Sequence, residues 1–361
     1  MKKLIMILLC MLLACMPAGC SKAPGPNQET GREEQTTGET TTQAPEPTTE
    51  TAEITTAQTT TEEPAEPESF VFQPKVSSAY LKEIFGETRV ETWYHIVDAV
   101  LAGEETFACP DQDTYDWVIY QFPNKCFPVL EGMYTADYGS PVEGGVGRLI
   151  YTMPEEERTK RIEEFEALCT EIMNQTMSPE YSDLENALSL YRYFCSTYVY
   201  DTETYDRMRD EYVDDLSAWR LLTTGTGICS EIAPAYSYLL MQAGIDATVM
   251  MGGDHEWSYV RINGKNYHVD PTFGLQSDDS LEYFMMNDEK RAEYFDPNEF
   301  VICSVYTQEH EHPDYVADDD TFRPLWTAYL DDFDHKTHIM HCHTLDDNGN
   351  AIPMKFDYTG Y

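Results

Sequence analysis

Apolar residues recur every three or four positions after Arg158, which predicts a long amphipathic helix. Ile162, Phe165, Leu168 and Ile172 follow this spacing, and at 3.6 residues per turn they share one face. We expect this face to pack against the interior of the protein.

A second helix is predicted to begin after Ser182. Ser182 and Glu185 have the spacing of a capping box, in which each side chain bonds the backbone N–H of the other residue. The apolar face of this helix carries Leu184, Leu188, Tyr191, Cys195 and Tyr198. The β-rich residues 198–201 then end it, and we expect both helices to be packing elements of the core.

The pattern then changes to two β-rich segments, residues 257–262 and 265–270, on either side of an Asn-Gly pair at 263–264. Asn-Gly between two such segments is a strong signal for a hairpin with a two-residue turn. A turn of that length places Trp257 opposite Asp270.

His255 lies two residues before Trp257 and is therefore predicted on the same face of the sheet as Asp270. Diagonal neighbours lie roughly 7 to 8 Å apart at the backbone, a gap that an imidazole and a carboxylate can close with a hydrogen bond. Asp270 would then orient His255 and stabilise its cationic form. His268 is a competing base, because it lies opposite Tyr259 on that same side.

Cys229 is the candidate nucleophile. The Gly-containing residues 224–228 run directly into a helical segment at 230–243, which a glycine closes. Cys229 is therefore expected at a helix N-terminus, where unpaired backbone N–H groups and the helix dipole favour the thiolate. With His255 and Asp270 it would supply a nucleophile, a base and an orienting group, which suits acyl transfer.

Three segments resemble, in this order, the motifs of the bacterial transglutaminase-like superfamily: Gly-Ile-Cys-Ser-Glu-Ile-Ala at 227–233, Asp-His-Glu-Trp-Ser-Tyr-Val at 254–260, and Gly-Lys-Asn-Tyr-His-Val-Asp-Pro-Thr-Phe at 264–273. The resemblance extends over about residues 158–305. It implies an α+β fold with a transglutaminase-like, papain-like core, in which a helix-borne Cys packs against an antiparallel sheet carrying His and Asp. It also implies the triad Cys229, His255 and Asp270, with Trp257 as a candidate for the substrate pocket.

This resemblance implies a mechanism more firmly than a substrate, because the superfamily contains transglutaminases, peptidases, glycopeptide amidases and inactive members. Glu256 and Ser258 also replace the small residue and the asparagine often found beside the family's tryptophan. We expect a cysteine peptidase, amidase or acyltransferase that acts on amide bonds of peptides, proteins or cell-wall peptides through a thioester acyl-enzyme. Hydrolysis and amine transfer both remain open. The alternative is a non-catalytic binding or structural lipoprotein that retains the fold.

The first twenty residues have the pattern of an export signal. Two lysines precede an apolar run over residues 4–16, which is short for a membrane span. Cys20 resembles the lipidated cysteine of a bacterial lipobox, and Cys15 is a rival site. Residues 21–68 are rich in Thr, Glu and Pro, which predicts a disordered tether. We therefore expect a lipid anchor on the extracytoplasmic side of the bacterial cell membrane.

The formal net charge of −42 narrows the choice of partner. Such acidity repels phosphate backbones, so we expect no nucleic-acid binding. The expected partners are a peptide, protein or peptidoglycan-peptide substrate and, through the lipid anchor, a membrane. No cofactor is expected. A calcium-regulated transglutaminase is a third hypothesis, although residues 346–350 lack the spacing of an EF-hand loop.

Composition and motifs divide the chain into five expected segments. The expected segments are a lipoprotein signal peptide at 1–20, the tether at 21–68, an α/β lead-in region at 69–157, the catalytic core at 158–305 and a C-terminal β-hairpin extension at 306–361. An Asn-Gly pair at 348–349 predicts this last hairpin and pairs His341 with Phe356 and His343 with Met354. Two alternate histidines leave zinc as a lesser hypothesis, but we predict no metal site.

Six cysteines remain in the exported chain beside Cys20 and Cys229. They allow fifteen disulfide pairings, among which the sequence does not choose. These residues are Cys109, Cys126, Cys169, Cys195, Cys303 and Cys342.

Overall fold

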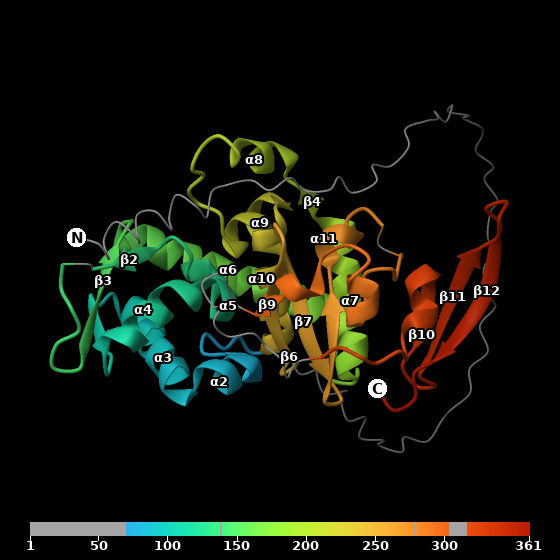
Figure 1. Cartoon of the computed structure of the whole chain (residues 1–361), viewed down its shortest axis with the longest axis horizontal. Coiled ribbons are helices and arrows are strands. Elements are labelled where there is room, and N and C mark those ends of the chain that lie inside the picture. The colour runs from blue at the N-terminus through green and yellow to red at the C-terminus, as the bar shows by residue number, and fades with distance from the viewer. Residues whose placement is uncertain (1–69, 138, 278, 303–315) are drawn as a thin grey trace, which may run out of the picture. The chain divides into compact units, whose positions relative to one another are not determined.

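The computed structural model describes residues 70–137, 139–277, 279–302 and 316–361. These residues form helices and mainly antiparallel sheets (Figure 1), which agrees with the predicted α+β class. The expected signal segment, the tether, the lipidation site at Cys20 and Cys303 lie outside the described residues. Within these ranges, no helix is long and apolar enough to span a bilayer.

The centre of the core is a four-stranded sheet with the order β8-β7-β6-β9. Its strands are β6 (Asp246–Gly252), β7 (His255–Ile262), β8 (Lys265–Val269) and β9 (Val301–Ile302). Strands β7 and β8 form the predicted hairpin, in which Ile262 pairs with Lys265. Asn263 and Gly264 have φ angles of 51° and 73°, as this tight turn requires. The two-residue turn is therefore confirmed.

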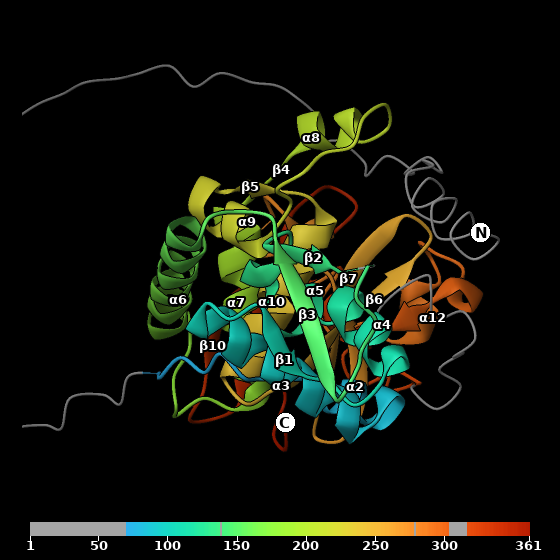
Figure 2. The same cartoon turned by 90° about the vertical axis from the view of Figure 1, so that its left-hand side faces the viewer.

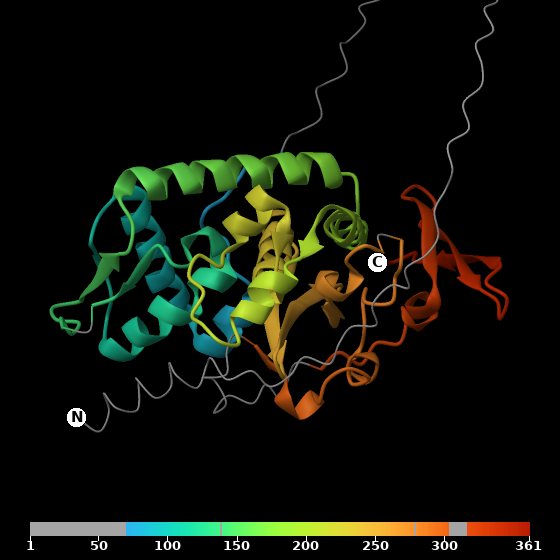
Figure 3. The same cartoon turned by 90° about the horizontal axis from the view of Figure 1, so that it is seen from above.

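Helix α10 (Cys229–Gln242) packs against β6 and β7. The helices α7 (Asp183–Thr197) and α9 (Ala218–Thr224) pack against α10, and α6 (Glu155–Thr176) packs against α7 and α9. α6 is the long helix that runs past α7 and α9 (Figure 3). Ile162, Phe165 and Ile172 are buried on its inner face. The capping box of Ser182 and Glu185 starts α7, so both predicted helices are confirmed.

Short elements connect this core. Strands β4 (Val199–Tyr200) and β5 (Thr226–Gly227) pair in parallel directly before α10. The remaining elements are α8 (Thr202–Arg207), α11 (Pro271–Gly274), α12 (Asp288–Arg291) and the 3₁₀ turn η2 (Pro297–Glu299).

The lead-in region contains both helices and strands. Its elements are α2 (Ala79–Phe85), α3 (Glu87–Ala102), β1 (Thr106–Ala108), α4 (Gln112–Gln121), α5 (Pro123–Cys126), η1 (Pro128–Leu130), β2 (Tyr134–Ala136) and β3 (Val146–Tyr151). β3 is the middle strand of a small antiparallel sheet (Figure 2). Asp246 of β6 accepts hydrogen bonds from the Ser78 hydroxyl at 2.6 Å and the Ala79 N–H at 2.8 Å. These bonds tie the region to the central sheet.

The C-terminal residues form three antiparallel strands after the 3₁₀ helix η4 (Arg323–Thr327). These are β10 (Tyr329–Asp334), β11 (Ile339–Leu345) and β12 (Ala351–Asp357). The sheet is attached to the core, because the Tyr358 hydroxyl donates to Glu185 of α7 at 2.6 Å and the Leu281 N–H donates to the Ala328 carbonyl at 3.0 Å.

The hairpin between β11 and β12 exists, but the predicted register was wrong by one residue. His341 pairs with Lys355 rather than Phe356, and His343 pairs with Pro353 rather than Met354. The loop is longer than two residues, because the last pair of the hairpin is Leu345 with Ala351. Within this loop, the Asp346 carboxylate accepts hydrogen bonds from the backbone N–H groups of Asn348 and Asn350 and from the side-chain amide of Asn350. This side chain stabilises the longer loop and shifts the pairing.

Candidate active site

Asp270 lies directly after β8, where it is fully buried. Its backbone N–H donates to the Tyr283 carbonyl at 2.9 Å. Its side chain caps α11, because Oδ1 accepts the Phe273 N–H at 3.1 Å. The other oxygen, Oδ2, lies 2.8 Å from Nε2 of His255, the first residue of β7. The predicted contact between histidine and aspartate is therefore confirmed, although the catalytic role of the pair stays a prediction.

The charge of Asp270 determines which nitrogen of His255 carries the proton. Burial pushes the pKa of Asp270 upward, but the charges of His255 and Arg291, together with hydrogen bonds, outweigh burial and lower this pKa below its ordinary value. An ionised carboxylate only accepts hydrogen bonds. Nε2 of His255 therefore donates, and Nδ1 of the neutral ring is left as the basic nitrogen.

Cys229 is the first residue of α10, as the glycine-containing loop predicts. Its side chain is nearly buried, with 7% of its surface exposed. The N–H groups of this first helical turn and the helix dipole favour a thiolate at Cys229.

Contacts along α10 join it to the middle of β7. The hydroxyl of Ser237 lies 2.8 Å from that of Ser258, which donates to the Ala233 carbonyl one helical turn earlier at 3.2 Å. α10 also packs against α11, the helix capped by the aspartate. The three predicted site residues thus lie on elements that pack together.

A buried carboxylate fixes the loop that carries the cysteine. Glu231 is fully buried, and its Oε2 accepts the Ile228 N–H at 3.0 Å while Oε1 accepts the Ser217 N–H at 3.0 Å. The guanidinium of Arg220 bonds both oxygens and also donates to Asp201 at 2.8 Å. Sequence reasoning missed this role because the cap residue is an isoleucine, whereas a capping box is recognised by Ser or Thr.

Three aromatic rings surround His255. The centroid of its ring lies 4.7 Å from that of Phe273, 5.4 Å from that of Phe295 and 6.0 Å from that of Trp257. Trp257 is fully buried here and supports the imidazole. Its predicted role in the substrate pocket stays a prediction.

His268, the competing base, has both ring nitrogens engaged. The Trp257 indole N–H donates to Nδ1 at 2.8 Å, so this nitrogen is an acceptor. Nε2 then carries the proton and donates to Asp288 at 2.8 Å. With 0% of its surface exposed, His268 serves as a buried link between the tryptophan and Asp288.

Other cysteines differ from Cys229 in their surroundings. Cys109, Cys169 and Cys342 are buried free thiols. Burial raises the pKa of Cys109 and of Cys342 to about 11 and that of Cys169 well above its ordinary value. These three thiols are therefore protonated at neutral pH and poor nucleophiles.

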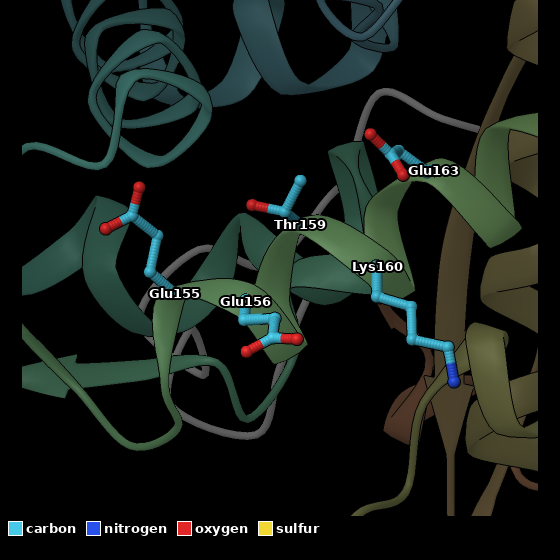
Figure 4. Close-up of a pocket in the computed structure, with 5 residues that line it drawn as sticks. All are labelled: Glu155, Glu156, Thr159, Lys160 and Glu163. Carbon is cyan, nitrogen blue, oxygen red and sulfur yellow. The ribbon is translucent and has the colours of Figure 1, made fainter.

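No group of three or more His, Cys, Asp or Glu side chains is placed to hold a metal ion in the part of the chain that the structure describes. An open depression does occur on α6 (Figure 4). Its lining residues are Glu155, Glu156, Thr159, Lys160 and Glu163. All lie in the first nine residues of a single helix, and none belongs to the candidate triad.

Comparison with protein families identifies the domain that holds this site. Residues 167–278 match the model of the transglutaminase-like superfamily. The matched span is a transglutaminase-like domain and contains Cys229, His255 and Asp270. Comparison with curated proteins gave no match to this chain.

Proposed function

We propose that this protein is a cysteine enzyme that cleaves or transfers amide bonds through a thioester intermediate. The observation that carries the proposal is the buried hydrogen bond from His255 to Asp270, at the end of a strand that packs against the helix headed by Cys229. The match to a transglutaminase-like domain supports this reaction class, because members of that superfamily are often cysteine peptidases or acyltransferases.

The proposed reaction begins with proton transfer from the Cys229 thiol to Nδ1 of His255. The thiolate attacks the amide carbonyl, and a tetrahedral oxyanion forms near the N–H groups at the start of α10. When the C–N bond breaks, His255 returns the proton to the leaving amine and a thioester remains. Water or a second amine then gives its proton to His255, attacks the thioester and releases Cys229.

Water as the second nucleophile gives hydrolysis, whereas an amine gives a new amide bond. We favour hydrolysis, because an extracytoplasmic site is in contact with abundant water. The expected substrates are peptides, proteins or the peptide part of the cell wall.

The test combines thiol labelling with a substrate screen on the full chain. We expect iodoacetamide to label Cys229 selectively at neutral pH, and the His255→Ala variant to be labelled about a hundredfold more slowly. Glutamine-containing and cell-wall peptides are then offered with and without a primary amine, and ammonia, cleaved peptide and amide product are measured. Cys229→Ala should abolish every product, whereas the matched variant Cys342→Ala should keep them. If Cys229 reacts no faster than an unfolded thiol and no product forms, the non-catalytic alternative replaces the enzyme.

We also propose that Cys20 carries a lipid that anchors the protein outside the bacterial cytoplasm, with residues 21–68 as a tether. The proposal rests on the sequence pattern of residues 1–20. Metabolic labelling with a radioactive fatty acid tests it: Cys20→Ser should lose the label and leave the membrane fraction, and Cys15→Ser should keep both. The opposite result would assign the lipid to Cys15.

A further inference from the structure

Arg291 is the buried cation of this site. It ends α12 and has 0% of its surface exposed. Its Nη1 donates to Oδ2 of Asp270 at 2.9 Å, and this is the same oxygen that accepts from His255. The carboxylate therefore receives a histidine and an arginine at one oxygen and the Phe273 N–H at the other.

The guanidinium also lies against the rings that surround His255. Its central carbon is 3.9 Å from the centroid of Trp257, 4.7 Å from that of Phe295 and 5.3 Å from that of Phe273. The imidazole and the guanidinium thus share one aromatic enclosure, in which contact with ring faces favours a cation.

Keeping this arginine buried is costly for the fold. Its Nε and Nη2 are buried and have no hydrogen-bond partner among the described residues, and unpaired buried donors destabilise a folded protein. The bond to Asp270 is the hydrogen bond that the described structure gives its side chain. Burying Arg291 is unfavourable for stability by itself, and a role in holding the Asp270 carboxylate accounts for its position.

We propose that Arg291 is a positioning residue of the triad: by donating to Oδ2 it keeps Asp270 a hydrogen-bond acceptor, so that His255 holds its proton on Nε2 and offers a bare Nδ1 to Cys229. This inference rests on the proposed cysteine chemistry and adds a fourth residue to it. Arg291 lies 21 residues after Asp270 and beyond the matched domain span of 167–278.

The loss of this cation has a defined chemical consequence. The other titratable groups facing Asp270 are Tyr191 on α7 and Tyr283, and burial raises the pKa of both, so they stay neutral. Without Arg291, the carboxylate keeps the His255 and Phe273 N–H groups as donors, and burial then favours a proton on the carboxyl. A protonated carboxyl donates to Nε2 and moves the histidine proton to Nδ1. Nδ1 is then no longer a base.

The decisive measurement is NMR of the His255 ring nitrogens in isotope-labelled full-length protein. It is made in a Cys229→Ala background, so that the imidazole cannot take the thiol proton, and the signal is assigned by its loss in His255→Gln. With Arg291 present, we expect Nδ1 to be unprotonated at neutral pH. With Arg291→Met, the Nδ1 signal should move to the protonated position, and the exposed control Arg323→Met should leave it unchanged.

Labelling of Cys229 in the otherwise native chain provides the second readout. We expect Arg291→Met to slow alkylation roughly tenfold to a hundredfold, less than the roughly 10⁴-fold loss that follows direct removal of a triad's orienting carboxylate. Arg291→Lys, which keeps a cation, should retain part of the rate and the native Nδ1 state. If circular dichroism shows that Arg291→Met is unfolded, the test compares Arg291→Lys with Arg291→Gln instead. The inference requires that these two variants differ in the Nδ1 signal, and equal signals overturn it.

Two failures are distinguishable. If the native protein shows no His255-dependent reactivity at Cys229, the proposed function fails. If the native protein is reactive and folded Arg291→Met has the same Nδ1 signal and the same alkylation rate, the role of Arg291 alone is refuted.

Discussion

The indole N–H of Trp257 donates a hydrogen bond to Nδ1 of His268 across 2.8 Å. This contact distinguishes His268 from His255, the other histidine of the hairpin, as a candidate base. Nδ1 of His268 is occupied by a donor, whereas Nδ1 of His255 lies on the side of its ring away from Asp270. The tryptophan that packs against one histidine thus makes the other unsuitable as a base.

Replacing His268 is expected to affect stability more than chemistry. His268→Leu leaves the Trp257 indole N–H without its acceptor, which costs about 1 to 3 kcal/mol for a buried polar group. Urea denaturation measures this loss. The alkylation rate of Cys229 in the folded variant should stay within about threefold of native, whereas His255→Leu should lower it about a hundredfold or more. Equal rate losses in the two variants would contradict the assignment of His255 as the base.

The stability of the protein should depend on pH through Asp270. Its folded-state pKa is lowered from the ordinary value of 3.8, so the folded protein binds this proton less readily than the unfolded chain. The stabilisation is therefore fully present above pH 3.8 and is lost as the pH falls through the lower folded-state value. Urea denaturation of native protein and Asp270→Asn across this range measures it. The stability difference between them should shrink as the pH falls below 3.8; a difference that is constant with pH would contradict the lowered pKa.

Glu231→Gln is expected to loosen the loop before Cys229. The substitution removes the negative charge that Arg220 bonds. Breaking a buried ion pair costs roughly 3 to 5 kcal/mol of stability, and we expect a loss near the lower value because Arg220 is partly exposed to solvent. Thermal denaturation should show a lowered midpoint, and alkylation of Cys229 should slow because the helix N-terminus is less well held. Glu163→Gln, on the exposed face of α6 (Figure 4), is the matched control and should change neither quantity.

A methyl group at Gly274 is expected to disturb the segment that follows Asp270. A Cβ there lies 2.6 Å from Sγ of Cys195 and also overlaps the Tyr191 hydroxyl. Overpacking of this kind costs about 1 to 3 kcal/mol and moves the backbone. Gly274→Ala should therefore lower stability in urea and slow Cys229 labelling. Gly139→Ala, whose Cβ has an ordinary contact distance of 3.4 Å, should be neutral. Combining Gly274→Ala with Cys195→Ala should recover part of the loss.

Local sequence signals predicted one hairpin correctly and the other with an error of one residue. The pair Asn263 and Gly264 forms the turn by itself, so its position fixes the register of β7 and β8. At the second Asn-Gly pair, the Asp346 side chain bonds donors across the loop, and the longer loop shifts β12 by one residue. The Asn-Gly pair alone does not predict the hydrogen bonds of Asp346, which favour the longer loop over a two-residue turn.

The contact between His255 and Asp270 was predictable for a similar reason, but the contacts that support the candidate site were not. His255 and Asp270 are close in a single hairpin, so alternation along two strands brings them to one face. Arg291 reaches the same carboxylate from a separate helix, and Glu231 caps a helix whose preceding residue is Ile228. These contacts depend on how distant elements pack, which periodicity and short motifs do not encode.

The stacking of Trp257 beside His255 gives the site an internal optical reporter. Their planes differ by 20° with the ring centroids 6.0 Å apart, and a cationic imidazole at this range quenches indole fluorescence by accepting an electron from the excited ring. Movement of either ring when a molecule binds at the site is therefore expected to change the Trp257 emission, and Trp257→Phe identifies this signal by its loss.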